Sequence, residues 1–128
     1  HKIKIIKDFS NDIIIMGNEG QLHQMFTNIL SNSEQAIIDK GYIKITTKAI
    51  DKKVLISIKD SGIGISKESV NRIFEPFYTT KQPGKGTGLG LSIVYNIIKE
   101  HKGNIELKSK ENIGTNLEIT FNKANNGI

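Results

Sequence analysis

Four segments of the chain alternate apolar and polar residues, a pattern typical of strands that bury only one side. Their apolar positions are Ile43 and Ile45, then Val54, Ile56 and Ile58, then Ile105 and Leu107, and finally Leu117, Ile119 and Phe121. Turn-forming residues at 51–53 and 111–114 join the four segments into two hairpins. A sheet made from such strands is covered by helices on one face and is exposed to water on the other.

Residues 19–39 and 89–101 carry apolar residues at helical spacing, and we predict a further short helix at 67–74. Residues 2–6 and 13–16 are predicted to be short strands separated by a turn. Asn28 and Asn32 lie one turn apart on the same side of the first helix. Asn32 falls at the edge of the apolar stripe beside Met25, so we expect its side chain to face a cleft.

The length and composition narrow the class of protein. A chain of 128 residues fits one domain, so residues 1–128 are interpreted as a single domain, and the start at His1 indicates a piece of a longer protein. The chain has no cysteine, which excludes disulfides and cysteine-ligated metals and suits the cytoplasm. The longest apolar run is Ile13–Met16, far short of the roughly 20 residues that cross a membrane. We therefore expect a cytoplasmic domain without membrane contact, in a parent protein that can itself be membrane-anchored.

The formal net charge of +5 comes from lysines scattered along the chain. They are not interleaved with aromatic residues on one stripe, as a nucleic-acid-binding surface would favour, so no nucleic-acid partner is predicted. The excess positive charge fits a solvated surface and also suits a polyphosphate ligand or an acidic protein partner.

Asp60-Ser61-Gly62-Ile63-Gly64 follows directly on a predicted strand and is the first candidate for ligand binding. A carboxylate only accepts hydrogen bonds, so it suits the exocyclic amine of adenine and repels the carbonyl that guanine presents there. The two glycines leave room for a flat ligand because they carry no side chain. On its own this short motif also describes a tight surface turn.

Residues 81–92 form a glycine-rich segment that runs into the last predicted helix. Such a segment offers unpaired backbone N–H groups and the positive end of the helix dipole to phosphate groups, and Lys81 and Lys85 add charge. The segment matches neither the P-loop nor the dinucleotide-binding fingerprint, and a flexible linker is the alternative interpretation. The aromatic residues Phe74, Phe77 and Tyr78 precede it, either as core residues or as a hydrophobic anchor for this loop.

Taken together, these segments resemble the boxes of one family, in the same order and spacing. Residues 28–32 resemble the N box of sensor histidine kinases, 60–64 the G1 box, 74–81 the F box and 86–90 the G2 box, and Gly114-Thr115 resembles the closing Gly-Thr pair. The wider GHKL superfamily also includes type II topoisomerases, mismatch-repair ATPases and Hsp90 chaperones. The resemblance implies an α+β fold, the two-layer Bergerat ATP-binding sandwich, in which a mixed, mostly antiparallel sheet of about five strands is covered on one face by three helices.

The resemblance also implies roles for individual residues. Asn32 resembles the Mg²⁺ ligand, Asp60 the reader of adenine, and Phe74 and Phe77 the anchor of an ATP lid. The implied ATP-binding residues are Asn32, Asp60, Gly62, Gly64, Phe74, Phe77, Thr80, Lys81, Lys85, Gly86, Thr87, Gly88, Leu89, Gly90 and Thr115, and the implied catalytic residues are Asn28, Asn32 and Lys81. The expected cofactors are ATP and Mg²⁺, with ADP as a second nucleotide ligand.

Two residues depart from the pattern of the family. Gln35 stands where many of these kinases carry Lys or Arg, so the phosphate charge would be met mainly by Lys81, Lys85 and the metal ion. Ser33 stands where Ala is usual, and we expect no consequence from it. The sequence of residues 77–81 and the short lid resemble the nitrogen-sensor subgroup.

Asn28 distinguishes a kinase from a hydrolase. The hydrolases of the superfamily carry a water-activating Glu at this position, and a neutral amide is a poor base. We therefore predict transfer of the γ-phosphoryl group to a histidine on a separate dimerisation and phosphoacceptor domain of the same protein, with a response regulator downstream. Because His1, His23 and His101 are not interpreted as acceptors, the isolated domain is expected to be nearly inactive. A nucleotide-gated ATPase and a non-enzymatic basic binding module are the alternatives.

Overall fold

The computed structural model describes residues 2–10, 15–75 and 90–124, and a single sheet dominates it. The strands are β1 (Lys2–Phe9), β2 (Lys40–Ile50), β3 (Lys53–Asp60), β4 (Asn104–Lys110) and β5 (Gly114–Asn122), in the order β1-β2-β3-β5-β4. β1 and β2 are parallel, whereas the other three pairings are antiparallel. The predicted mixed, mostly antiparallel sheet is therefore confirmed.

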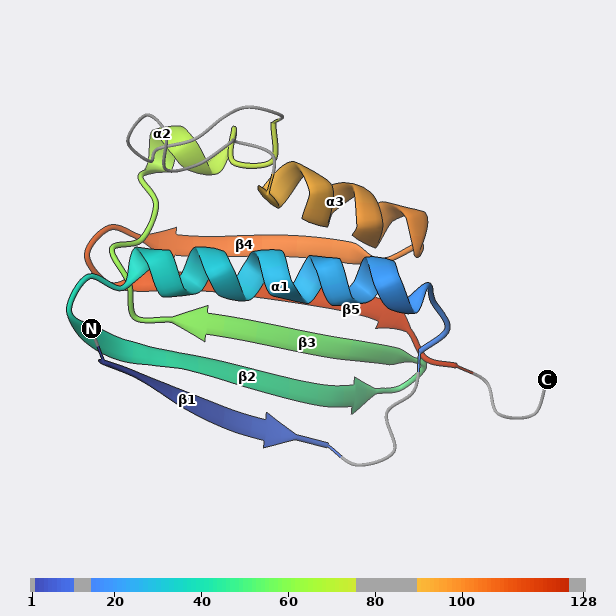
Figure 1. Cartoon of the computed structure of the whole chain (residues 1–128). Coiled ribbons are helices and arrows are strands. Elements are labelled where there is room, and N and C mark those ends of the chain that lie inside the picture. Colours follow the sequence, from blue (N-terminus) through green and yellow to red (C-terminus); the bar gives the residue numbers. More distant parts are fainter. Residues whose placement is uncertain (1, 11–14, 76–89, 125–128) are drawn as a thin grey trace.

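The helices α1 (Glu19–Ala36), α2 (Lys67–Val70) and α3 (Gly90–Glu100) lie on one face of this sheet (Figure 1). α1 connects β1 to β2, because two parallel neighbours can only be joined by a crossover that passes over the sheet. The two-layer α+β sandwich expected from the sequence is confirmed. None of the helices in the described ranges is both long and apolar enough to cross a membrane.

The core lies between the helix layer and the sheet, and the alternation of the strands builds it. The helix-facing residues of β3 and β5 are buried: Val54, Ile56, Ile58, Leu117, Ile119 and Phe121. They pack with Met25 and Ile29 of α1 and with Val94, Ile97 and Ile98 of α3. The intervening residues of the same strands, such as Ser57 and Glu118, face the open side of the sheet.

Both ends of α1 are fixed by identifiable groups. The Asn18 side chain accepts a hydrogen bond from the Gln21 N–H at 2.9 Å, which caps the first turn. The helix ends at Ala36 rather than at the predicted Asp39, because Ile37 is extended and buries its side chain in the core. This early end matters for the site, since it presents the last turn of α1 to the loop that follows β3.

His101 holds the beginning of α1 against the end of α3. Its Nε2 accepts a hydrogen bond from the Asn18 N–H at 2.9 Å, and its Nδ1 lies 2.7 Å from the Ile97 carbonyl oxygen. These two contacts require the neutral tautomer in which Nδ1 carries the proton. A structural role for His101 fits the prediction that it is not a phosphate acceptor.

Several element boundaries differ from the predictions. Ile15 and Met16, the described part of the predicted strand at 13–16, are not in a strand, whereas β1 continues to Phe9 because it pairs with β2 along its length. The short helix predicted at 67–74 ends at Val70 and continues as turns. The first hairpin turn consists of Asp51 and Lys52 only, with Asp51 at a φ of 54°.

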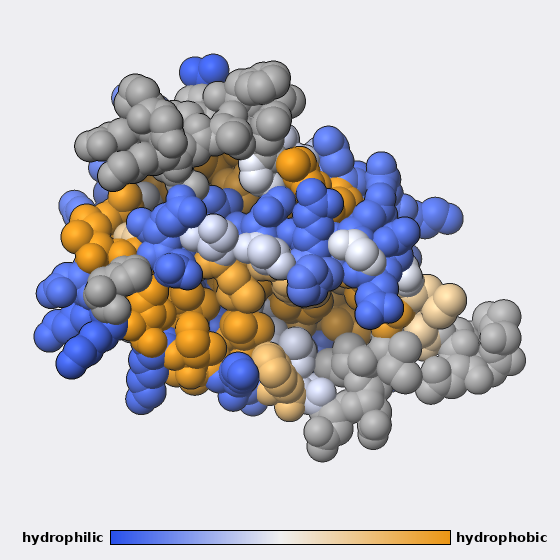
Figure 2. Space-filling view, in the orientation of Figure 1, coloured by the Kyte–Doolittle hydropathy of each residue, from blue (hydrophilic) through white to orange (hydrophobic). Residues whose placement is uncertain are grey.

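The helix layer does not cover the whole sheet. Figure 2 shows apolar surface below α1, on the side of the sheet where β1 lies. A shallow groove there is lined by Ile3, Ile5, Lys7, Leu30, Glu34, Ile43 and Ile45, and Ile5 is 48% exposed. The groove lies between α1 and β1, the edge strand of the sheet.

Candidate nucleotide-binding site

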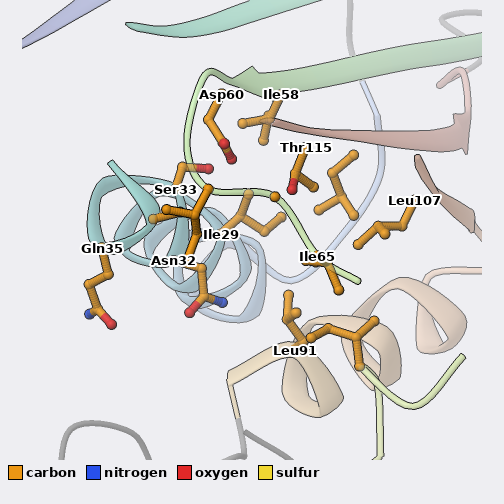
Figure 3. A pocket seen from close by; sticks show the side chains of 15 residues that line it. Ile29, Asn32, Ser33, Gln35, Ile58, Asp60, Ile65, Leu91, Leu107 and Thr115 are labelled. Carbon is orange, nitrogen blue, oxygen red and sulfur yellow. The ribbon is translucent and has the colours of Figure 1, made fainter. Parts of the chain in front are cut away.

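A cavity of about 150 Å³ opens at the end of the sheet where β3 stops, between the last turns of α1 and the beginning of α3 (Figure 3). Most of its wall is apolar and comes from Ile29, Ala36, Ile58, Ile63, Ile65, Ile73, Leu91, Leu107 and Leu117. Its polar lining residues are Asn32, Ser33, Gln35, Asp60 and Thr115. An apolar cavity of this size is known to hold a benzene ring, so a flat heterocycle fits with part of it toward the opening.

Asp60 is the last residue of β3, and the residue is only 4% exposed. The Gly62 N–H donates to Asp60 Oδ1 at 2.9 Å, and the carboxyl also accepts hydrogen bonds from the Ser33 hydroxyl and the Thr115 N–H. Burial raises the pKa of this carboxyl above its usual value, and the three hydrogen bonds offset only part of the rise. Asp60 is the only ionisable side chain among the described residues that line the cavity.

The two glycines after Asp60 are required by contacts within the protein. A Cβ on Gly62 would lie 2.6 Å from the Ala36 carbonyl oxygen at the end of α1. Gly64 has a φ of 73°, and a Cβ there would collide with the Lys110 carbonyl. The loop is also tied down, since the Ile63 N–H donates to the Ala36 carbonyl at 2.9 Å. Glycine was predicted here because it leaves room for a ligand. The structure shows another reason, which is that a side chain at either position would collide with a backbone carbonyl group of the protein.

Asn32 lies at the mouth of the cavity, near the beginning of α3. Its Nδ2 would be 3.5 Å from a Cβ built on Gly90, the first residue of α3. Figure 3 shows the Asn32 amide turned away from Asp60, so the two polar side chains define different parts of the cavity. Asn32 was predicted to face a cleft, and this prediction is confirmed.

The structure brings together only some of the predicted site residues. Asn32, Asp60, Gly64 and Thr115 line the cavity. Asn28, Gly62, Phe74 and Gly90 are described but are not among its lining residues, and the Phe74 ring instead packs on Tyr95 of α3 with centroids 5.5 Å apart. The other predicted residues lie outside the described ranges: Phe77, Thr80, Lys81, Lys85, Gly86, Thr87, Gly88 and Leu89.

Sequence reasoning missed a role for Ser33. It was noted only as a departure from Ala, yet it is buried in the cavity wall and donates to Asp60. Its position one turn after Ile29 on the apolar stripe of α1 was the available signal, because that spacing directs the side chain inward. The apolar walls supplied by Ile65, Ile73 and Leu107 were missed as well, since the chain brings them together only in the folded state.

A buried carboxyl at the end of a strand, a mostly apolar cavity beside it and an amide on the cavity wall are the features expected of an ATP-binding domain of the kind found in histidine kinases. Comparison with known proteins supports this class. The family described as "Histidine kinase-, DNA gyrase B-, and HSP90-like ATPase" matches residues 17–125. The chain belongs to this family, and membership implies the use of ATP.

Individual relatives place the chain on the histidine-kinase side of the family. Sporulation kinase E of Bacillus subtilis (strain 168) is 50% identical over 102 residues, which are 79% of this chain and 14% of the relative. The solved catalytic domain of histidine kinase ThkA, in a nucleotide-free form, superposes with a TM-score of 0.83 at 35% identity, covering 94% of this chain and 79% of that one. Full-length ShkA in complex with AMPPNP gives a TM-score of 0.82 at 28% identity, covering 98% of this chain and 27% of that one. The chain is thus a histidine-kinase-type ATP-binding domain and spans a small part of its longer relatives.

Proposed function

We propose that this chain binds Mg-ATP and donates the γ-phosphoryl group to a histidine on a separate dimerisation and phosphoacceptor domain of the same protein. That histidine then supplies the phosphoryl group to a response regulator. In this proposal residues 1–128 form one cytoplasmic catalytic domain of a two-component sensor kinase, whose parent protein can be membrane-anchored. The buried carboxyl of Asp60 at the end of an apolar slot is the observation that carries the proposal.

Adenine is the base that this slot suits best. Asp60 accepts hydrogen bonds from three groups of the protein, and it lines a cavity whose walls are mostly apolar. A base bound there must offer an N–H donor and two apolar faces, which adenine does with its exocyclic amine. Guanine would place a carbonyl oxygen against a buried carboxylate, and that contact costs affinity because neither group can donate.

The phosphates and Mg²⁺ would lie toward Asn32. Within the described residues, no cluster of three or more His, Asp or Glu side chains could hold a metal by itself. Mg²⁺ prefers oxygen ligands and is often held by one or two protein groups together with the phosphates of its nucleotide. The Asn32 amide oxygen supplies one such ligand at the mouth of the cavity, and Lys81 and Lys85 of the proposed lid would add positive charge. The assignment of Gly84, Gly86, Gly88 and Gly90 to an ATP lid stays a prediction, and so does that of the chain to the nitrogen-sensor-like subgroup.

Transfer to a histidine, rather than to water, is favoured by the chemistry of Asn28. A side-chain amide cannot act as a general base at neutral pH, so attack by water on the γ-phosphorus has no strong catalyst at this position. The names of the relatives agree with this choice, since they are sporulation kinases and sensor histidine kinases. The chain's own contribution would be to hold the nucleotide and orient its γ-phosphoryl group.

Calorimetric titration tests the proposal with nucleotides and Mg²⁺. ATP and ADP are expected to bind the chain, whereas GTP is expected to bind much more weakly. Phosphorylation is then tested by adding the phosphoacceptor domain of the parent protein with radiolabelled ATP. Equal affinity for ATP and GTP would contradict the adenine assignment, and rapid phosphate release without an acceptor would favour an ATPase over a kinase.

A further inference from the structure

We propose that Ser33 is a positioning residue for Asp60 and that its hydroxyl strengthens the binding of adenine without any need to touch the nucleotide. The inference rests on the proposed function, because it concerns how the same site reads its base. It starts from a residue that the family pattern left without a role. Its support is the local geometry of the last turns of α1.

Ser33 and Asp60 face each other inside the cavity wall. Ser33 is 6% exposed, and both residues line the cavity. Figure 3 shows the Ser33 hydroxyl directed toward the Asp60 carboxyl, and the two side chains form a hydrogen bond. Because Ser33 belongs to α1 and Asp60 to β3, this hydrogen bond joins the helix layer to the end of the sheet.

The Ser33 hydroxyl matters because Asp60 has no counter-ion in the cavity wall. No other ionisable side chain lines the cavity in the described ranges, so the charged carboxyl depends on hydrogen-bond donors. Two of its donors are the backbone N–H groups of Gly62 and Thr115, which the fold supplies whatever their side chains are. The Ser33 hydroxyl is the donor that a single substitution can remove.

The same three donors also orient the carboxyl. A carboxylate has two oxygens with about four acceptor positions between them, and three of these are used by Gly62, Thr115 and Ser33. The remaining position is left for one N–H donor of a ligand. A carboxyl fixed in this way does not have to be ordered when the ligand arrives, which lowers the cost of binding.

Removal of the hydroxyl has two measurable consequences. In Ser33→Ala the affinity for ATP is expected to fall roughly three- to ten-fold, the scale of one hydrogen bond. The pKa of Asp60 is expected to rise further, because a donor that favours the charged form is lost. The pH below which the affinity for ATP decreases is therefore higher in Ser33→Ala than in the original chain. A purely structural role of Ser33 would not produce this shift. Ser33→Thr retains a hydroxyl and is expected to recover most of the affinity.

The experiment uses calorimetry with Mg-ATP over a range of pH for the original chain, Ser33→Ala, Ser33→Thr, Asp60→Asn and the double variant Ser33→Ala/Asp60→Asn. Ser57→Ala is the matched control, because it removes a hydroxyl that hydrogen-bonds Asn116 at 2.8 Å on the open face of the sheet. The Asp60 carboxyl is also titrated by NMR without nucleotide in the original chain and in Ser33→Ala. This second measurement tests the contact even where a variant binds no ATP.

The inference predicts weaker binding and a higher Asp60 pKa for Ser33→Ala, no change for Ser57→Ala, and no effect of Ser33→Ala when Asp60 is already Asn. Unchanged affinity and an unchanged NMR titration in Ser33→Ala would overturn it, while leaving the proposed function intact if Asp60→Asn alone weakens binding. If Asp60→Asn binds ATP as tightly as the original chain, both the assignment of adenine to this cavity and the role of Ser33 are refuted. If Ser33→Ala weakens binding equally in the Asp60→Asn background, the hydroxyl acts independently of Asp60 and the inference is refuted.

Discussion

Replacement of Asp60 by Asn is the most informative single change, because it keeps the shape of the side chain and removes its charge. In the folded protein Asp60 is 4% exposed, and its carboxyl accepts hydrogen bonds from Gly62, Ser33 and Thr115. The amide has only one oxygen, and its NH₂ group would face either one of these donors or the amine of adenine. Binding should suffer because a donor then meets a donor inside an apolar cavity.

The magnitude of the loss can be worked from the contact itself. A hydrogen bond to a charged group contributes about 1.5–3 kcal/mol. Since about 1.4 kcal/mol corresponds to a factor of ten, Asp60→Asn should raise the Kd for ATP by roughly 10- to 150-fold. Calorimetry with Mg-ATP measures this directly, and urea unfolding measures the free energy of unfolding of the same two proteins.

Folding stability should respond differently from binding. Burial raises the Asp60 pKa, so the folded chain holds this proton more tightly than the unfolded chain does. The stability that Asp60 contributes is therefore greatest at low pH and falls as the pH rises from its unfolded pKa through its raised folded pKa. The Asn variant lacks this step, so the difference in unfolding free energy between the original chain and the variant should decrease over that interval. A Kd for ATP within two-fold of the original would contradict a contact between Asp60 and the nucleotide, and a pH-independent difference in stability would contradict a raised Asp60 pKa.

Three further predictions follow from described contacts. The affinity for adenosine should fall as the pH falls through the raised Asp60 pKa, because a protonated carboxyl has one acceptor fewer. An affinity that does not change with pH over that interval, measured by fluorescence competition, would contradict this. Gly64→Ala should destabilise the fold by about 1–3 kcal/mol in urea unfolding, because a φ of 73° and the Lys110 carbonyl both disfavour a Cβ, and an unchanged midpoint would count against the described loop. His101→Ala should lower the free energy of unfolding by about 1–2 kcal/mol in the same assay, because it removes the acceptor for the Asn18 N–H and the ring packed on Phe121. Equal stability of the two proteins would show that the fold does not need this contact between α1 and α3.

The hairpins were the most predictable part of the fold. In β3 and β5 every second residue is buried, so the alternation of Val54, Ile56 and Ile58 already identifies the face that meets the helices. The parallel pairing of β1 with β2 was not predicted, because it depends on a crossover through α1 and has no local signature. The early end of α1 was missed for a related reason, since Ile37 leaves the helix to fill a core that only the assembled sheet creates.

The sequence predicted the parts of the candidate site that depend on a single polar residue. It predicted fewer of the parts that depend on packing between distant elements. Asp60 was predicted to bind the ligand because residues 60–64, in order with the other segments, resemble the G1 box of histidine kinases; it does line the cavity, and its role toward adenine stays a prediction. The contact of Ser33 with Asp60 could not be read from spacing, since the two residues meet only when α1 packs against the end of β3. Gly62 was identified for its lack of a side chain, but the group that demands glycine is the Ala36 carbonyl of a distant helix.

If Asp60 accepts a hydrogen bond from the exocyclic amine of adenine, a nucleotide without that amine must bind more weakly, and a comparison of two nucleotides measures the difference. The Kd for Mg-ATP is measured beside that for purine riboside triphosphate, which lacks only the amine, in the original chain and in Asp60→Asn. Loss of the amine is expected to weaken binding to the original chain by roughly ten-fold or more. The two nucleotides are expected to bind Asp60→Asn with similar, weak affinity. Equal affinity of the original chain for both nucleotides would contradict the role of Asp60 in binding adenine.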